Sequence, residues 1–139
     1  TTQVLSAKKV TPSQDVQNYL ETKKVFEIIR TRYLNHRPIS VDTSYFPIDI
    51  GMKVVATHKT NDIFYALEKD LGLSLGPALI SMEARSADGK LAKLLDVHNG
   101  KPIFWVNRLI RDTNNRAVVC EYLAYRGDAY KYHLELSRA

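Results

Sequence analysis

Residues 25–45, VFEIIRTRYLNHRPISVDTSY, place β-branched and aromatic residues on both sides of a short polar turn at residues 35–37. That arrangement is typical of a β-hairpin. The pattern recurs over residues 103–125, IFWVNRLIRDTNNRAVVCEYLAY, around a second polar turn at residues 113–115. The sequence therefore predicts two hairpins of similar design.

The same two elements precede each hairpin. Extended runs cover residues 4–10 and 78–82, and helix candidates cover residues 12–20 and 87–95. In the first helix, Thr11 is the expected N-cap, because a proline follows it at the first turn. A β-α-β-β unit thus occurs twice, which predicts an α+β fold of two pseudo-symmetric halves. Halves that share one core leave a cleft where they meet, and ligand pockets favour such junctions.

Two further elements are predicted outside the repeated unit. A helix is expected over residues 63–72, with Thr60 or Asn61 as its N-cap and Gly72 as its C-terminal stop. Residues 130–136 alternate aromatic or leucine side chains with polar ones. Strict alternation of this kind predicts a half-buried strand.

Composition limits the class of protein. The chain has 139 residues, 45% of them apolar, which fits one domain over residues 1–139 with a core of its own. No apolar run approaches the length of a membrane span, and no secretory signal precedes the first strand, so a cytoplasmic protein without a membrane partner is predicted. Since the chain starts at Thr1, we expect it to be a fragment of a longer protein.

The net charge of +5 raises the question of nucleic-acid binding. The basic residues are dispersed and acidic residues lie between them, so a solvated, mildly basic surface is the preferred interpretation. The four histidines lie far apart without ligand spacing, so no metal and no cofactor are predicted. Cys120 lies within a strand among apolar residues, where a buried inert thiol is expected. Nothing in these patterns requires an enzyme.

The first hairpin carries an unusual pair of arginines. Arg30 and Arg32 interrupt a strand face that is otherwise apolar. A three-residue turn would pair Leu34 with Pro38 and place Arg30 opposite Asp42, whereas a two-residue turn would move Asp42 to the other face. Two guanidinium groups suit a carboxylate or phosphate bidentately, and one acid suits hydroxyl or amino groups of the same ligand. The alternative is a solvent-facing sheet with an ordinary ion pair.

The second hairpin carries similar chemistry. Arg108, Arg111, Glu121 and Tyr125 supply cations, an acid and a hydroxyl, and Glu121 and Tyr125 share one strand face. Asp128 in the following turn is expected to accept backbone hydrogen bonds, a structural role.

The order and spacing of many positions resemble one known family. The positions that carry the resemblance are Arg30, Arg32, Pro38, Asp42, Tyr45, Pro47, Ile63, Phe64, Leu67, Glu68, Leu94, Leu95, Pro102, Arg108 and residues 125–130. Over residues 4–136 the chain is similar to the UTRA domain, the C-terminal effector-binding domain of GntR-type bacterial transcription regulators of the HutC subfamily. The resemblance implies a chorismate-lyase-like fold around a central ligand cavity, a homodimer, and an N-terminal winged helix-turn-helix that reads operator DNA in the full polypeptide.

The resemblance also implies roles for particular residues. In sugar-phosphate-binding members of the family, two arginines hold the phosphate and an acid ten residues later holds the sugar, which corresponds to Arg30, Arg32 and Asp42. The family's helix serine is replaced by Asp62, and a frequent tyrosine by Phe64. A carboxylate beside a phosphate is repulsive, whereas beside an amine it is favourable, so Asp62 leaves the presence of a phosphate open.

The predicted ligand site therefore comprises Arg30, Arg32, Asp42, Asp62, Phe64, Glu121 and Tyr125. The leading interpretation is an effector-binding domain for a small polar, anionic metabolite such as a sugar phosphate, which modulates transcription through a DNA-binding domain. One alternative is a chorismate-lyase-like enzyme on the same fold. Another is a pure dimerisation module, which predicts a cavity filled by side chains with Arg30 and Arg32 outside it.

Overall fold

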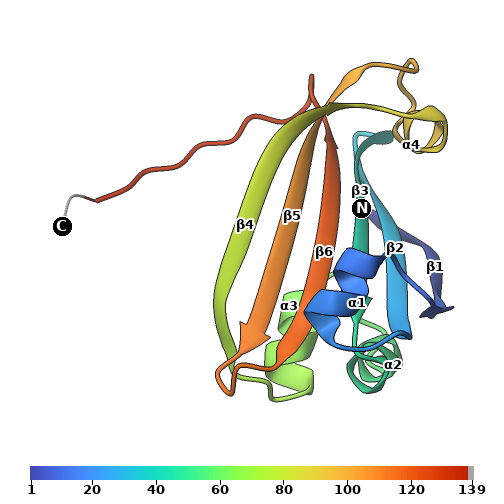
Figure 1. Cartoon of the computed structure of the whole chain (residues 1–139). Helices are drawn as coiled ribbons and strands as arrows, with labels where there is room; N and C mark the ends of the chain where they lie inside the picture. The colour runs from blue at the N-terminus through green and yellow to red at the C-terminus, as the bar shows by residue number, and fades with distance from the viewer. Residues whose placement is uncertain (138–139) are drawn as a thin grey trace.

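The computed structural model describes residues 1–137 and contains one six-stranded antiparallel sheet with helices on both faces (Figure 1). The strand order is β1-β2-β3-β6-β5-β4. The strands are β1 (Thr2–Val10), β2 (Val25–Leu34), β3 (Arg37–Phe46), β4 (Leu75–Ser86), β5 (Pro102–Asp112) and β6 (Ala117–Arg126). The helices are α1 (Gln14–Leu20), α2 (Ile48–Ala56), α3 (Ile63–Tyr65), the π-helix η1 (Ala66–Asp70) and α4 (Gly89–Leu95).

The predicted duplication is confirmed. β1-α1-β2-β3 forms one half of the sheet and β4-α4-β5-β6 forms the other, and the two halves join where β3 pairs with β6 at the centre. The α+β fold class predicted from the sequence is therefore correct. The centre of the sheet is also the junction at which a ligand pocket was expected.

The turn of the first hairpin differs from the prediction. Leu34 pairs with Arg37, so the turn has two residues and the expected pairing of Leu34 with Pro38 is wrong. Asn35 and His36 both have positive φ, 51° and 66°, as the hairpin turn of type I′ requires. Asparagine and histidine are among the residues that adopt this conformation most readily, which explains the shorter turn.

A β-bulge nevertheless restores the predicted arginine pairing. The register shifts between Arg32 and Tyr33, where β3 carries Ile39 as one extra residue. Beyond the bulge Arg30 lies opposite Asp42, on the same face of the sheet. The two-residue turn alone would have placed Asp42 on the other face, so the bulge determines which face carries the carboxylate.

Helix α2, which no sequence pattern predicted, packs on the face of the sheet that carries Arg30. It contains Gly51 and β-branched residues, which are poor helix formers. A Cβ atom at Gly51 would collide with the side chain of Phe26 on β2. Glycine therefore permits the close approach of helix and strand, and tertiary packing of Ile50 and Val54 stabilises the helix.

Two predicted helices begin or end differently. The N-cap of α3 is Asp62, whose carboxylate accepts a hydrogen bond from the Tyr65 amide at 3.1 Å, rather than Thr60 or Asn61. The expected single helix over residues 63–72 divides into α3 and η1 and ends before Gly72, which has φ of 70° as predicted for a stop. Likewise α1 begins at Gln14 rather than at residue 12, so Thr11 is not its N-cap.

The predicted C-terminal strand is absent from the described part of the chain. Residues 130–136 form no helix or strand, and Figure 1 shows this segment running away from the sheet. Leu134 and Leu136 are 65% and 78% exposed. A strand requires a neighbouring strand to pair with, and the segment reaches none among residues 1–137, so the alternating pattern stays unpaired.

Apolar side chains fill the space between the sheet and the helices on each face. Ile28, Phe46 and Val118 lie beneath α2 and η1, and α1 and α4 cover the opposite face with separate clusters. Within residues 1–137 no helix has the length and apolar character needed to cross a membrane.

Candidate functional site

A cavity of about 370 Å³ opens where the two halves of the sheet meet, on the face that carries α2 and α3. Its lining comes from β2, β3, β5, β6 and the segment that leads into α3. The lining residues are Arg30, Arg32, Asp42, Asn61, Asp62, Ile63, Phe64, Arg108, Leu123 and Tyr125. Six of the seven residues predicted for the ligand site are in this set, and the seventh, Glu121, lies directly beneath it.

Arg30 lies at the base of the cavity and is only 6% exposed. Its Nη1 donates to the Thr60 carbonyl at 2.9 Å, and its Nη2 lies 3.6 Å from Asp42 Oδ2 and 3.8 Å from Glu121 Oε2. Burial lowers the pKa of the guanidinium, while the two carboxylates oppose that shift. A solvent-facing sheet with an ordinary surface ion pair is therefore excluded.

Asp42 is the acidic partner on β3 and is 1% exposed. Its Oδ2 lies 3.6 Å from Arg30 and 3.8 Å from Arg32. Burial raises the pKa of this carboxyl, against the lowering effect of the two arginines. Asp42 Oδ1 and Arg30 Nε have no hydrogen-bond partner among the described residues. Buried polar atoms are normally paired, so the contact between Arg30 and Asp42 is an incomplete ion pair.

Glu121 forms the polar base beneath the cavity. This fully buried carboxylate on β6 accepts from Ser44 Oγ at 2.8 Å and from Arg108 Nε at 2.9 Å. Arg108 Nη2 lies 2.7 Å from the same carboxylate, and its guanidinium stacks over the Phe64 ring at 4.5 Å. Glu121 therefore holds Arg108 in place and connects it with Arg30.

Arg32 is the most accessible arginine of the cavity. Its side chain is 47% exposed, and its only ion pair within residues 1–137 is the one with Asp42 at 3.8 Å. Asp62 lines the cavity and also caps α3. Tyr125 on β6 also lines the cavity, and burial raises the pKa of its hydroxyl. Its ring stacks on the Tyr130 ring, with 4.0 Å between the centroids.

Several predictions about individual residues need correction. Arg111 is not in the cavity: it stacks over Tyr19 of α1 on the opposite face of the sheet. Asp128 accepts two hydrogen bonds from the Arg126 guanidinium, at 3.1 and 3.0 Å, where backbone donors were expected. Cys120 is buried, and burial raises the pKa of its thiol to about 11, consistent with an inert thiol.

Four cavity residues were missing from the predicted site. Arg108 could have been found from the repeat, because it faces Glu121 in the second hairpin as Arg30 faces Asp42 in the first. Ile63, the first residue of α3, carried part of the family resemblance but was not assigned to the site. No comparable signal marks Asn61, in the loop before α3, or Leu123, which is placed by the alternation of β6.

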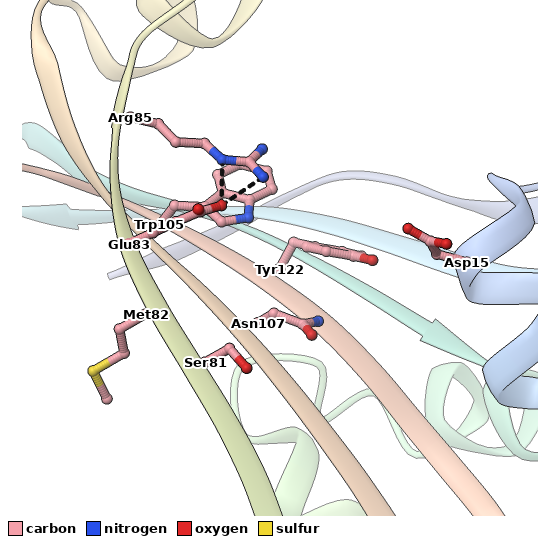
Figure 2. A pocket seen from close by; sticks show the side chains of 8 residues that line it. All are labelled: Asp15, Ser81, Met82, Glu83, Arg85, Trp105, Asn107 and Tyr122. Atoms are coloured by element: carbon pink, nitrogen blue, oxygen red, sulfur yellow. Dashed lines mark hydrogen bonds and ion pairs between the residues drawn. The ribbon is translucent and has the colours of Figure 1, made fainter.

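A second hollow lies on the opposite face of the sheet, between β4 and α1 (Figure 2). Figure 2 shows the Arg85 guanidinium over the Trp105 ring and paired with Glu83. Tyr122 and Asp15 also line this hollow. Arg85 Nε donates to Glu83 at 2.6 Å, so its charge is already matched. The first cavity, with three arginines and two unpaired buried polar atoms, is the stronger candidate.

The cavity combines three cations with three carboxylates. Arg30, Arg32 and Arg108 surround one region, and Asp42, Asp62 and Glu121 are distributed around and beneath it. Such a site can bind an anionic group through arginine forks and can accept hydrogen bonds from hydroxyl or amino groups of the same molecule.

Comparisons with known proteins agree with this architecture. The UTRA domain family matches residues 1–131. The HTH-type transcriptional repressor NagR of Bacillus subtilis is 23% identical over 108 residues, which is 78% of this chain and 44% of NagR. The chain therefore spans less than half the length of that relative.

Solved structures share the fold. A GntR-family transcriptional regulator from Enterococcus faecalis superposes with a TM-score of 0.89 at 19% identity, covering 98% of this chain and 100% of that one. The ligand-binding domain of a protein assigned to the GntR family from Bordetella bronchiseptica gives a TM-score of 0.84 at 23% identity, covering 99% and 90%. The fold is thus the chorismate-lyase-like α+β fold predicted above, and the chain belongs to the UTRA domain family of GntR-type transcription regulators.

Proposed function

We propose that this chain is the effector-binding and dimerisation domain of a GntR/HutC-type transcription regulator, and that its cavity binds a small polar, anionic metabolite. The observation that carries the proposal is the cavity at the junction of the halves, lined by Arg30, Arg32 and Arg108. Arginine forks bind carboxylate and phosphate groups bidentately. Arg32 and Arg108, whose side chains are 47% and 28% exposed, are the arginines that a ligand in the cavity can reach most directly.

The regulatory part of the proposal rests on the family and on linkage. A ligand that binds two conformations of the domain unequally shifts the equilibrium between them. In the proposed protein that shift changes operator binding by an N-terminal winged helix-turn-helix. The role is binding rather than catalysis, because the relatives named above are transcription regulators.

A thermal-shift screen tests the effector. The chain is mixed with sugar phosphates, amino acids and phosphonates, and a ligand of the folded state raises its melting temperature by mass action. Arg32→Ala should remove the shift without unfolding the chain, because this side chain is half exposed. Arg37→Ala is the matched control, since Arg37 lies at the exposed hairpin turn and its loss changes the net charge equally. A ligand whose shift survives in Arg32→Ala contradicts the assignment of the cavity.

Calorimetry with a variant of Asp62 tests whether the ligand carries a phosphate near that residue. Asp62→Ser keeps an N-cap residue on α3 while it removes a negative charge from the cavity lining. We expect tighter binding of sugar phosphates to this variant in calorimetry, because the repulsion is removed. Unchanged affinity for every sugar phosphate that binds the unaltered chain would place Asp62 outside the phosphate environment.

A further inference from the structure

The charges that the sheet contributes to the cavity do not cancel. Asp42 lies 3.6 Å from Arg30 and 3.8 Å from Arg32. Glu121 lies 2.7 Å from Arg108 and 3.8 Å from Arg30. Three arginines therefore share two carboxylates, and the sheet part of the lining carries one positive charge in excess.

Arg32 is the residue that carries this excess toward the cavity. Its side chain is 47% exposed, whereas those of Arg30 and Arg108 are 7% and 28% exposed. Its contact with Asp42 at 3.8 Å is beyond hydrogen-bond distance. An anionic group that enters the cavity can therefore form a bidentate contact with the Arg32 guanidinium.

The segment that leads into α3 adds one negative charge to the same lining. Asp62 is exposed, and its Oδ1 accepts a hydrogen bond from the Tyr65 amide at 3.1 Å. None of the ion pairs within residues 1–137 includes Asp62, and the nearby Lys59 pairs with Asp70 at 3.0 Å. The carboxylate of Asp62 therefore has no cationic partner in the described part of the chain.

These charges limit the chemistry of the ligand. A phosphate monoester carries a charge of roughly −1.5 to −2 at pH 7, which exceeds the single positive charge that Arg32 offers. Asp62 would also repel it. An uncharged ligand would leave both Arg32 and Asp62 unmatched. A ligand with one anionic and one cationic group matches both residues.

The rest of the lining is largely apolar. Ile63 and Leu123 are 2% and 4% exposed, and the Phe64 ring lies beneath the Arg108 guanidinium at 4.5 Å. The volume of about 370 Å³ lies near the lower end of the range for small-molecule sites, roughly 300 to 1,000 Å³. The cavity thus suits a compact ligand with an apolar part beside its charged groups.

We propose that the cavity binds an amino acid as a zwitterion, with its carboxylate on Arg32 and its ammonium group on Asp62. This ligand class rests on the proposed function and narrows it: the anionic group is a single carboxylate, and the same molecule carries a positive charge. The guanidinium supplies paired N–H donors, and the Asp62 carboxylate accepts from the ammonium group.

A panel of ligands tests the two contacts separately. Each standard L-amino acid is added to the chain in a thermal-shift assay, beside sugar phosphates. An amino acid that binds is then compared in calorimetry with its des-amino acid, which lacks the ammonium group, and with its amide, which lacks the carboxylate. We expect both analogues to bind roughly ten- to a hundredfold more weakly, because each leaves one charged contact unmade.

Two variants assign each contact to its residue. Asp62→Asn should weaken binding of the amino acid by roughly tenfold or more without weakening binding of the des-amino acid. Arg32→Ala should weaken binding of the amino acid without weakening binding of the amide. Asp88→Asn is the matched control, because Asp88 caps α4 through the Leu91 amide at 3.0 Å and lines a different hollow. It should leave all three affinities unchanged.

The outcomes separate this ligand class from the proposed function. A sugar phosphate that binds more tightly than every amino acid, and that depends on Arg32, refutes the zwitterion and leaves the proposed function in place. A des-amino acid that binds as tightly as its amino acid also refutes the zwitterion, as does an equal loss of all three ligands in Asp62→Asn. If no compound binds in a manner that depends on Arg32, the proposed function and the zwitterion are both refuted.

Discussion

Each hairpin places an arginine opposite a carboxylate at equivalent positions, but the distance between the two charged groups differs. In the second hairpin Arg108 donates to Glu121 at 2.9 Å, with a further contact at 2.7 Å. In the first hairpin the closest approach of Arg30 to Asp42 is 3.6 Å, beyond hydrogen-bond distance. Duplication of the fold has therefore not produced duplicated chemistry.

The difference shows where binding capacity remains. Glu121 is occupied by Arg108 and Ser44, whereas Asp42 Oδ1 and Arg30 Nε stay unpaired in the described structure. The second hairpin thus holds a closed, hydrogen-bonded ion pair, whereas the first holds an open one beside the half-exposed Arg32. The polar end of the effector is accordingly expected at the first hairpin.

The largest effect that tests this comparison is expected from Glu121→Gln. The substitution leaves two buried or half-buried arginines without their shared carboxylate. Breaking a buried pair by neutralising one partner costs roughly 3 to 5 kcal/mol. Urea unfolding should therefore show a loss of about 3 kcal/mol in the free energy of unfolding.

The matched control is Glu83→Gln, which neutralises an exposed glutamate in an ion pair with Arg85. Exposed pairs contribute roughly 0 to 1 kcal/mol, so this variant should be almost as stable as the unaltered chain. Equal losses from the two substitutions would show that Glu121 is not a structural charge.

The second test concerns how firmly Arg108 is held. Its guanidinium stacks over Phe64, and such contacts contribute roughly 0.5 to 2 kcal/mol. Phe64→Leu should lower the free energy of unfolding by about 1 kcal/mol, and a double-mutant cycle with Arg108→Ala should show coupling. The parallel cycle of Phe64→Leu with Arg32→Ala should show none. Coupling of the same size in both cycles would remove the distinction between the two arginines.

The hairpin pattern predicted the two β-α-β-β units, because alternation and turn residues are local signals, and the family resemblance supplied the chorismate-lyase-like fold. It did not reveal helix α2, whose glycine and β-branched residues are helical only because they pack on Phe26 and its neighbours. It also missed the bulge at Ile39, since a bulge compensates for turn length only once the strands are paired. Tertiary packing determined both features.

The site was predictable for a related reason. Arg30, Arg32 and Asp42 stand out in an otherwise apolar strand face, and the family resemblance supplied Asp62 and Phe64. The geometry of the charges was not predictable. Arg108 lies 2.7 Å from Glu121, which closes that ion pair, whereas Arg30 lies 3.6 Å from Asp42, and no sequence pattern distinguishes these distances. The strand predicted over residues 130–136 was wrong for the opposite reason: its alternation is strong, but it has no partner strand within residues 1–137.

A smaller effect is expected from Asp42→Asn. Burial raises the pKa of the Asp42 carboxyl despite two neighbouring arginines, so desolvation outweighs attraction there. A neutral side chain of the same shape removes that desolvation cost together with the attraction to the arginines, so it should lower the free energy of unfolding at neutral pH by less than Glu121→Gln does. A loss as large as that from Glu121→Gln, measured in the same urea titration, would contradict the contrast between the hairpins.

The smallest effect, and the one most specific to the first hairpin, is a pH dependence. The folded chain holds the Asp42 proton to higher pH than the unfolded chain, whose carboxyl pKa is about 3.9. Within the window between the unfolded and the raised folded pKa, the folded state binds more protons, so the free energy of unfolding contributed by Asp42 falls as pH rises. Asp42 therefore contributes most to the free energy of unfolding at pH values below this window. Above the window the carboxyl is charged in both states, and the folded state carries the full cost of desolvating it. Urea unfolding of the unaltered chain and of Asp42→Asn, compared at each pH from 4 upward, should isolate this decline, because the other titrating groups cancel. A difference that stays constant or grows with pH would mean that the fold does not disfavour the charged form of Asp42, and that its ion pair with Arg30 is not the open one described above.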